Sequence, residues 1–181
     1  MHTLDRTTHT EMPLLIVFAD LTRYTAETLR APDQELARTM DAFYERVAGR
    51  VEPAGGRVVK FIGDAAFIVF PEADVDRGVQ ALLDLKEEID AFFTGLGWEC
   101  RIFIKAHFGS AIAGPYGGAG DKRFDVLGKA VNRAARLECT GVALSAEAFH
   151  KLGPALQKRF KEHTPAATYM RVEDPQPSRR I

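Results

Sequence analysis

Hydrophobic positions change their spacing along this chain, and those changes divide it into expected strands and helices. An unbroken apolar run, Leu14 to Phe18, follows Pro13 and is typical of a strand buried on both faces. A polar turn comes next. Apolar residues at helical spacing then predict a first long helix ending at Pro53: Leu36, Met40, Phe43, Val47 and Val51.

The middle of the chain predicts a hairpin followed by a second long helix. Residues 57–62 and 65–70 favour two strands, because residues 63–64 between them form a glycine-containing turn. Pro71 ends the second strand. Helical spacing of apolar residues returns from Val75 to Leu96, which indicates the other long helix.

The second half of the chain predicts shorter elements. Residues 98–108 favour a strand, and we expect residues 111–114 to return as its partner before a flexible glycine-rich segment at 115–120. A further strand ends at Gly128, and the alanine-rich continuation favours a helix. The remaining elements are short helices at 145–152 and 154–160 and a closing strand at 167–172.

This order of elements is typical of an α+β fold, a ferredoxin-like sandwich in which two helices cover one face of a mainly antiparallel sheet. With 181 residues and 46% hydrophobic content, the chain can bury a sizeable core as one domain. We expect that domain at residues 13–173, between a flexible N-terminus at 1–12 and a flexible tail at 174–181.

Composition excludes several kinds of partner. A net charge of -1 supplies no general attraction for nucleic acid or anionic membranes, so we expect no nucleic-acid partner. Cys100 and Cys139 match no zinc or disulfide pattern. No apolar run has the length of a membrane span, and residues 1–12 lack the apolar core of a signal peptide, so a cytoplasmic location is expected.

Two aspartates lie at expected strand ends. If the first strand and the hairpin are neighbours, Asp20 and Asp64 converge above one edge of the sheet and need a cation. Hard oxygen ligands from few protein groups suit magnesium or manganese, which also take oxygens from water and phosphates. Taken singly, Asp64 is better explained as a turn residue and Asp20 as a helix or turn cap.

Further polar residues interrupt apolar patterns. Lys60 lies in an otherwise apolar strand, either as an edge-strand charge that opposes aggregation or as a donor to a base or phosphate. Asn132 and Arg136 are four apart on one helical face and can grip anionic oxygens, and Asp125 can read a base. By themselves, the helical residues favour an ordinary solvated face over a ligand site.

These residues together resemble the class III nucleotidyl cyclases, over nearly the whole chain from Leu14 to Val172. Three motifs agree in type, spacing and order: residues 18–22 with a first metal motif, residues 60–64 with a second, and Phe124-Asp125 through Asn132 and Arg136 with a base-reading motif. His107-Phe108-Gly109 resembles the strand between them.

The resemblance implies a role for each residue at these motifs. Asp20 and Asp64 would hold two divalent metal ions, Mg²⁺ or Mn²⁺, with the Leu21 carbonyl as a further ligand. Asn132 would orient the ribose, and Arg136 would stabilise charge on the α-phosphate. The residues expected beside the terminal phosphates are Thr22, Arg23, Tyr24 and Thr25.

Hydrogen-bond polarity bears on the choice of base. Lys60 donates and Asp125 accepts, which matches the N1 acceptor and N6 donor of adenine and opposes guanine. We therefore expect an adenylate cyclase that uses ATP, because the guanylate branch resembles a Glu and Cys arrangement at these positions. The alternatives are a guanylate cyclase or a catalytically silent cyclase-like nucleotide-binding or regulatory domain.

The resemblance also implies a head-to-tail homodimer with intersubunit active sites. Metal aspartates from one subunit would face the base-reading and helical residues of the other, so a monomer is expected to be inactive. Ser110 stands where some relatives carry a phosphate-contacting arginine, which leaves Arg23, Lys105 or another base for that contact. The chain is either a stand-alone enzyme or an excerpt of a larger protein.

Overall fold

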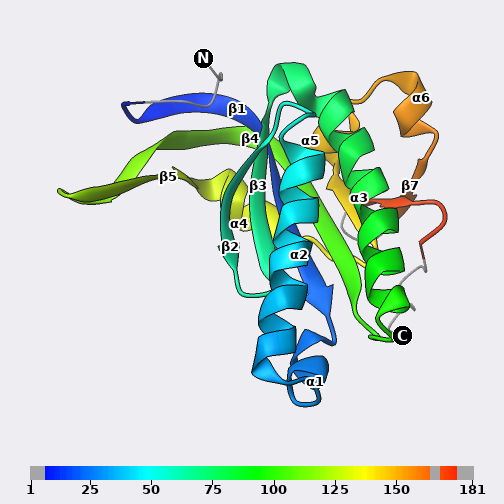
Figure 1. Ribbon diagram of the computed structural model, residues 1–181. Helices are drawn as coiled ribbons and strands as arrows, with labels where there is room; N and C mark the ends of the chain where they lie inside the picture. Colours follow the sequence, from blue (N-terminus) through cyan, green and yellow to red (C-terminus); the bar gives the residue numbers. More distant parts are fainter. Residues whose placement is uncertain (1–6, 164–167, 175–181) are drawn as a thin grey trace.

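The computed structural model describes residues 7–163 and 168–174, in which helices cover a single sheet (Figure 1). The strand order is β2-β3-β1-β4-β6-β8-β7, and β5 pairs with β4 off this path. The strands are β1 (Thr10–Thr22), β2 (Arg57–Ile62), β3 (Ala65–Pro71), β4 (Arg101–Gly118), β5 (Asp121–Leu127), β6 (Val142–Ser145), β7 (Phe160–His163) and β8 (Thr168–Arg171). Only the β4–β6 pair is parallel among the described strands.

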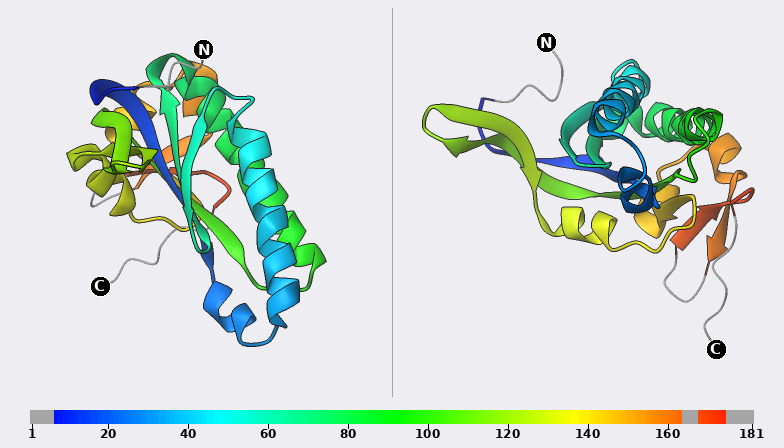
Figure 2. Two further views of the ribbon diagram at one scale, coloured as in Figure 1. Left: turned by 60° about the vertical axis from the view of Figure 1, so that its left-hand side comes forward. Right: turned by 60° about the horizontal axis from the view of Figure 1, so that its bottom comes forward.

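The helices lie on both faces of this sheet. The long helices α2 and α3 lie side by side over one face, and α4 lies on the other (Figure 2). Their bounds are α1 (Tyr24–Thr28), α2 (Asp33–Val51), the 3₁₀ helix η1 (Glu72–Asp74), α3 (Val75–Gly95), α4 (Lys129–Ala135), α5 (Ala146–Phe149) and α6 (Pro154–Gln157). The structure confirms the expected α+β sandwich.

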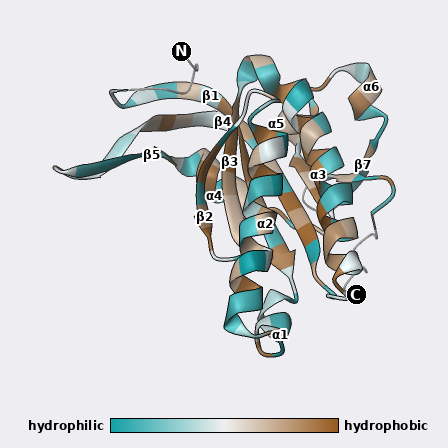
Figure 3. Cartoon of the chain, in the orientation of Figure 1, coloured by the Kyte–Doolittle hydropathy of each residue, from teal (hydrophilic) through white to brown (hydrophobic). Residues whose placement is uncertain are grey.

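Strand β1 runs through the centre and is buried on both faces. Leu15 and Val17 belong to the core under α2 and α3, whereas Leu14 and Ile16 belong to the core under α4. Successive strand residues point to opposite faces, so an unbroken apolar run supplies both cores. Figure 3 shows the central strands as mostly hydrophobic, with hydrophilic residues on the outer side of α2.

The expected return strand at residues 111–114 does not form, because these residues continue β4. The strand runs without a turn from Arg101 to Gly118, and its hairpin partner is β5. Continuous pairing with β1, from Thr10↔Ala113 to Thr22↔Arg101, keeps the backbone extended through Gly109. The ends of β4 and β5 therefore project from the body as a two-stranded arm (Figure 1).

The two ends of the expected domain also differ. Residues 10–12 pair in β1, and Met12 is buried, so the expected flexible N-terminus is structured there. Asp174 is also buried, and its Oδ2 accepts a hydrogen bond from the Val142 N–H at 2.6 Å, which anchors the first residue of the expected tail. Residues 1–6 and 175–181 lie outside the described part of the chain.

The shorter elements differ in number and in bounds from those expected. The helix expected at 154–160 ends at Gln157, and Phe160 begins β7. The closing strand is confirmed as β8, although Ala167 lies outside the described residues. Helix α1 and strand β6 were not expected. Among the described residues, no helix combines the length and apolar character needed to cross a membrane.

Candidate active site

Asp20 and Asp64 meet at one end of the central strands. Asp20 pairs with Ala65 across β1 and β3, so it lies beside the turn that carries Asp64. Although Asp20 reaches solvent, the surrounding protein removes part of its hydration and raises its pKa, and the Asp64 carboxylate raises it further. Lys105 partly offsets this effect. The structure thus brings together the two predicted metal-binding carboxylates.

This carboxylate pair fits a nucleotide-bound divalent metal better than a closed protein cage. The described residues include no group of three or more His, Cys, Asp or Glu side chains placed to hold a metal. Two carboxylates leave coordination positions for water and phosphate oxygens, the arrangement usual for Mg²⁺ in phosphate-transfer sites. The Leu21 side chain is buried, as expected for a residue that would contribute only its carbonyl.

Tyr24 of α1 and Tyr44 of α2 lie near Asp64. Its carboxylate contributes, after burial, to the raised pKa of both Tyr24 and Tyr44. The Tyr44 hydroxyl donates to the Gly63 carbonyl at 2.7 Å, and its ring stacks on Phe61 at 4.0 Å. Helix α2 therefore holds the turn that carries Asp64. Tyr44 could not be singled out from the sequence, since no feature of the sequence distinguishes it from the other residues of an amphipathic helix.

The residues expected beside the phosphates form the link from β1 to α1. The Thr22 hydroxyl both donates to the Arg101 carbonyl and accepts from its N–H, each at 3.2 Å. Arg23 adopts a left-handed conformation with φ 59°, and its guanidinium pairs with Glu99 at 2.9 Å. The expected polar turn is thus a tight corner rather than an open loop.

The remaining two of these residues begin the short helix. Tyr24 and Thr25 are the first residues of α1. Thr25 is exposed, and its carbonyl accepts a hydrogen bond from the Thr28 hydroxyl at 2.8 Å. Both residues follow Asp20 within five positions along the chain, so the structure keeps the expected group in one corner.

Lys60 and Asp125 are 65 positions apart in the sequence and meet in space. Lys60 Nζ donates to Asp125 Oδ2 at 2.5 Å, while Asp125 Oδ1 accepts from the Val126 N–H at 2.9 Å. They lie on the α4 side of the sheet, next to the stacked rings of Phe18 and Phe67, whose centroids are 4.9 Å apart. One donor and one acceptor are therefore fixed beside an aromatic surface.

Asn132 on α4 and Arg136, which caps the C-terminus of that helix, are exposed to solvent. Ala130 and Ala134 pack against the sheet, which turns the intervening polar positions outward. Within the described part of the chain, neither Asn132 nor Arg136 has a side-chain hydrogen bond or ion pair, and neither contacts the carboxylates. The predicted site residues therefore form separate groups within one chain.

A buried histidine links three elements behind α4. His107 on β4 is 3% exposed, and its Nδ1 lies 2.8 Å from the Ser145 hydroxyl, which also caps α5. Burial lowers its pKa; the nearby Glu147 carboxylate opposes that shift, and Arg133 on α4 reinforces it. Protonation of His107 therefore opposes the folded state.

We expect this histidine to make stability fall in acid. Above its ordinary pKa of about 6.5, both folded and unfolded chains hold neutral His107; below it, the unfolded chain takes the proton first. The free energy of unfolding should then fall by up to about 1.4 kcal/mol per pH unit until the folded-state pKa is passed. Urea denaturation from pH 8 to 5 measures this. His107→Gln should show a shallower dependence, and an equal dependence in both proteins would contradict this assignment.

Comparison with known proteins identifies the family. Residues 8–173 match the family described as the adenylate and guanylate cyclase catalytic domain. An adenylate cyclase of Anabaena cylindrica is 27% identical over 134 residues, 69% of this chain and 26% of that protein. The uncharacterized protein Mb2235 of Mycobacterium bovis is 32% identical over 122 residues, 67% of this chain and 29% of that protein. The chain spans about a quarter of the length of these relatives.

Solved structures share the fold. The adenylyl cyclase CyaB from P. aeruginosa superposes with a TM-score of 0.81 at 16% identity, covering 93% of this chain and 98% of that one. The guanylyl cyclase Cya2 gives a TM-score of 0.72 at 18% identity, covering 94% and 97%. Both branches of the family therefore share this architecture. Since the family match extends over nearly the whole sequence, this chain belongs to the class III adenylate and guanylate cyclase catalytic domains.

Proposed function

We propose that this domain is an adenylate cyclase, which converts ATP to 3′,5′-cyclic AMP and pyrophosphate. The observation that carries the choice of ATP is the pairing of Lys60 with Asp125 at 2.5 Å beside the Phe18 and Phe67 rings. An ammonium group only donates, and an ionised carboxylate only accepts. Adenine offers an acceptor at N1 and a donor at N6, whereas guanine offers the reverse at both positions.

The bound base would replace the Lys60–Asp125 contact with two charge-assisted hydrogen bonds. Asp125 Oδ1 is already occupied by the Val126 N–H, which fixes the carboxylate plane and leaves Oδ2 for the exocyclic amine. Lys60 has a 44% exposed side chain, so its ammonium can move from Asp125 to N1 without crossing a packed core. Guanine would place donor against donor and acceptor against acceptor at this site.

The other site residues act on the sugar and phosphates. Asp20 and Asp64 would hold two divalent metals, which supply Lewis-acid activation of the 3′-hydroxyl and neutralise charge on the leaving pyrophosphate. The Asn132 amide would orient the ribose for in-line attack on the α-phosphorus. Arg136, permanently charged, would stabilise the negative charge that grows on the α-phosphate oxygens. Residues 22–25 would lie beside the terminal phosphates.

We further propose that the active enzyme is a head-to-tail homodimer. Two features support this assembly: Asn132 on α4 and Arg136 at its C-terminal cap are exposed, and within the described residues they make no hydrogen bond or ion pair with Asp20 or Asp64. A symmetric dimer would bring each carboxylate pair to the partner's helix and form two equivalent sites.

A direct test is product analysis on the purified chain. With ATP and Mn²⁺ or Mg²⁺, we expect cyclic AMP and pyrophosphate in equal amounts, and much slower conversion of GTP. Faster conversion of GTP would favour the guanylate cyclase alternative, because guanylyl cyclases share this fold. If a verified dimer forms no product from either nucleotide with either metal, the silent regulatory domain replaces our proposal.

A further inference from the structure

Strands β2 and β5 approach each other without pairing in the sheet. β2 pairs with β3, and β5 pairs with β4, so no backbone ladder fixes one against the other. Side-chain contacts that join them include the Lys60–Asp125 ion pair and the Arg57 guanidinium, which lies over the Phe124 ring at 4.0 Å from its centroid. These two contacts use consecutive residues of β5.

A β-bulge places both contacts on one face. Val58 pairs with Ile68, but Lys60 pairs with Phe67, so Val59 is an extra residue in β2. In a regular strand, Arg57 and Lys60 are three residues apart and would point to opposite faces. The extra residue brings both to the same face of β2, from which they contact Asp125 and Phe124 of β5.

We propose that the Arg57–Phe124 contact is a positioning contact that sets specificity by fixing the donor and acceptor that read the base. This inference rests on the proposed nucleotide-binding function. Phe124 directly precedes Asp125, and among the described strands β5 pairs with β4 alone. A cation held on this ring therefore controls how far β5 stands from β2.

Losing the Arg57–Phe124 contact should change the preference for ATP over GTP more than it changes the stability of the fold. Hydrogen bonds to a base weaken when the distance or angle between donor and acceptor changes. If β5 moves relative to β2, Lys60 and Asp125 lose their match to adenine, while guanine, already mismatched, loses little. The ratio of the GTP to the ATP dissociation constant should therefore fall when this contact is removed.

The test compares nucleotide binding by Arg57→Gln, Phe124→Leu and the double variant. Equilibrium titration with ATP and GTP should show a threefold to tenfold smaller preference for ATP, roughly the effect of one cation–π contact. The double variant should be no worse than either single variant, because both remove the same contact. Arg57→Lys, which keeps a cation over the ring, should retain most of the preference.

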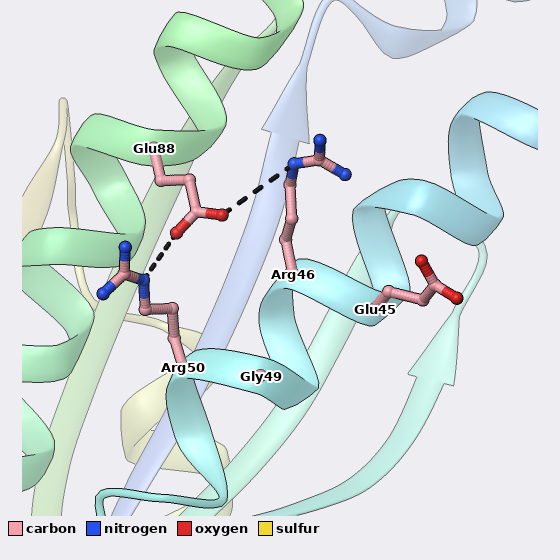
Figure 4. A pocket seen from close by; sticks show the side chains of 5 residues that line it. All are labelled: Glu45, Arg46, Gly49, Arg50 and Glu88. Atoms are coloured by element: carbon pink, nitrogen blue, oxygen red, sulfur yellow. Dashed lines mark hydrogen bonds and ion pairs between the residues drawn. The ribbon is translucent and has the colours of Figure 1, made fainter.

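Arg46 provides a matched control. Its guanidinium also lies over a ring, that of Phe92 at 4.1 Å, but on the outer face of α2 and α3. Figure 4 shows Arg46 and Arg50 around Glu88 at the shallow pocket on this face. Arg46→Gln should therefore leave the nucleotide preference unchanged. The melting temperature of this variant measures how much stability is lost when a cation–π contact away from the site is removed.

Three outcomes would overturn the inference. They are an unchanged preference in Arg57→Gln, equal weakening of ATP and GTP binding, and a similar loss of preference in Arg46→Gln. Because binding is measured directly, the inference is tested whether or not the wild-type chain turns over nucleotide. Turnover, measured in parallel, decides the proposed function separately.

Discussion

Replacing Asp20 or Asp64 with alanine is expected to lower cyclic nucleotide formation by about 10³-fold or more, because both metals would lose a carboxylate ligand. The two carboxylates lie close enough for Asp64 to raise the pKa of Asp20. Removing either relieves repulsion between them, so the folded structure should persist. Initial rates of cyclic AMP formation at saturating Mn²⁺ measure the loss.

The control for these variants is an acidic residue far from the site. Glu162 is exposed on β7, at the opposite edge of the sheet from the β2–β3 hairpin that carries Asp64. Glu162→Ala should keep wild-type rates, and melting curves should show that all three variants remain folded. Rates within a few-fold of wild type in Asp20→Ala or Asp64→Ala would contradict the assignment of the metal ligands.

Exchanging the base-reading pair is expected to reverse nucleotide choice. In Lys60→Glu combined with Asp125→Cys, the acceptor replaces the donor at one position and the fixed carboxylate is lost at the other. The ratio of kcat/KM for ATP to that for GTP should fall by about 10²-fold or more, since mismatched buried hydrogen-bonding groups reject a substrate strongly. Cyclic AMP and cyclic GMP formation are measured under the same conditions.

The single variant Lys60→Glu distinguishes a change of nucleotide specificity from a general loss of activity. Lys60→Glu alone places a carboxylate beside Asp125, where the wild-type atoms are 2.5 Å apart, so repulsion should impair both nucleotides. The double variant relieves that repulsion and should recover activity with GTP. A double variant that still prefers ATP would show that other residues choose the base.

The fold was predictable because the apolar residues of its main elements repeat at the spacing of a strand or a helix. The apolar run of β1 and the helical spacing of α2 and α3 indicated a sheet with two helices on one face, as observed. The length of β4 was not predictable from the residues near Gly109, because its pairing with β1, distant in sequence, keeps it extended. Short elements such as β6 depend on the same long-range pairing.

The candidate site was predictable as a set of motifs but not as a geometry. Spacing could not show that Lys60 contacts Asp125, since the fold alone brings β2 to β5. Arg57 was missed because a regular strand would turn it away from Lys60, and only the bulge at Val59 changes its face. Backbone irregularities of one residue leave no clear trace in the hydrophobic pattern.

If two subunits complete each active site, as we propose, mixing two inactive variants should restore activity. A dimer of Asp20→Ala with Arg136→Ala would contain one site with both defects and one site with neither. We predict that each variant alone is inactive, and that random exchange of subunits restores about a quarter of wild-type activity, since half of the dimers would have one intact site of two. No recovery after verified subunit exchange would contradict the shared site.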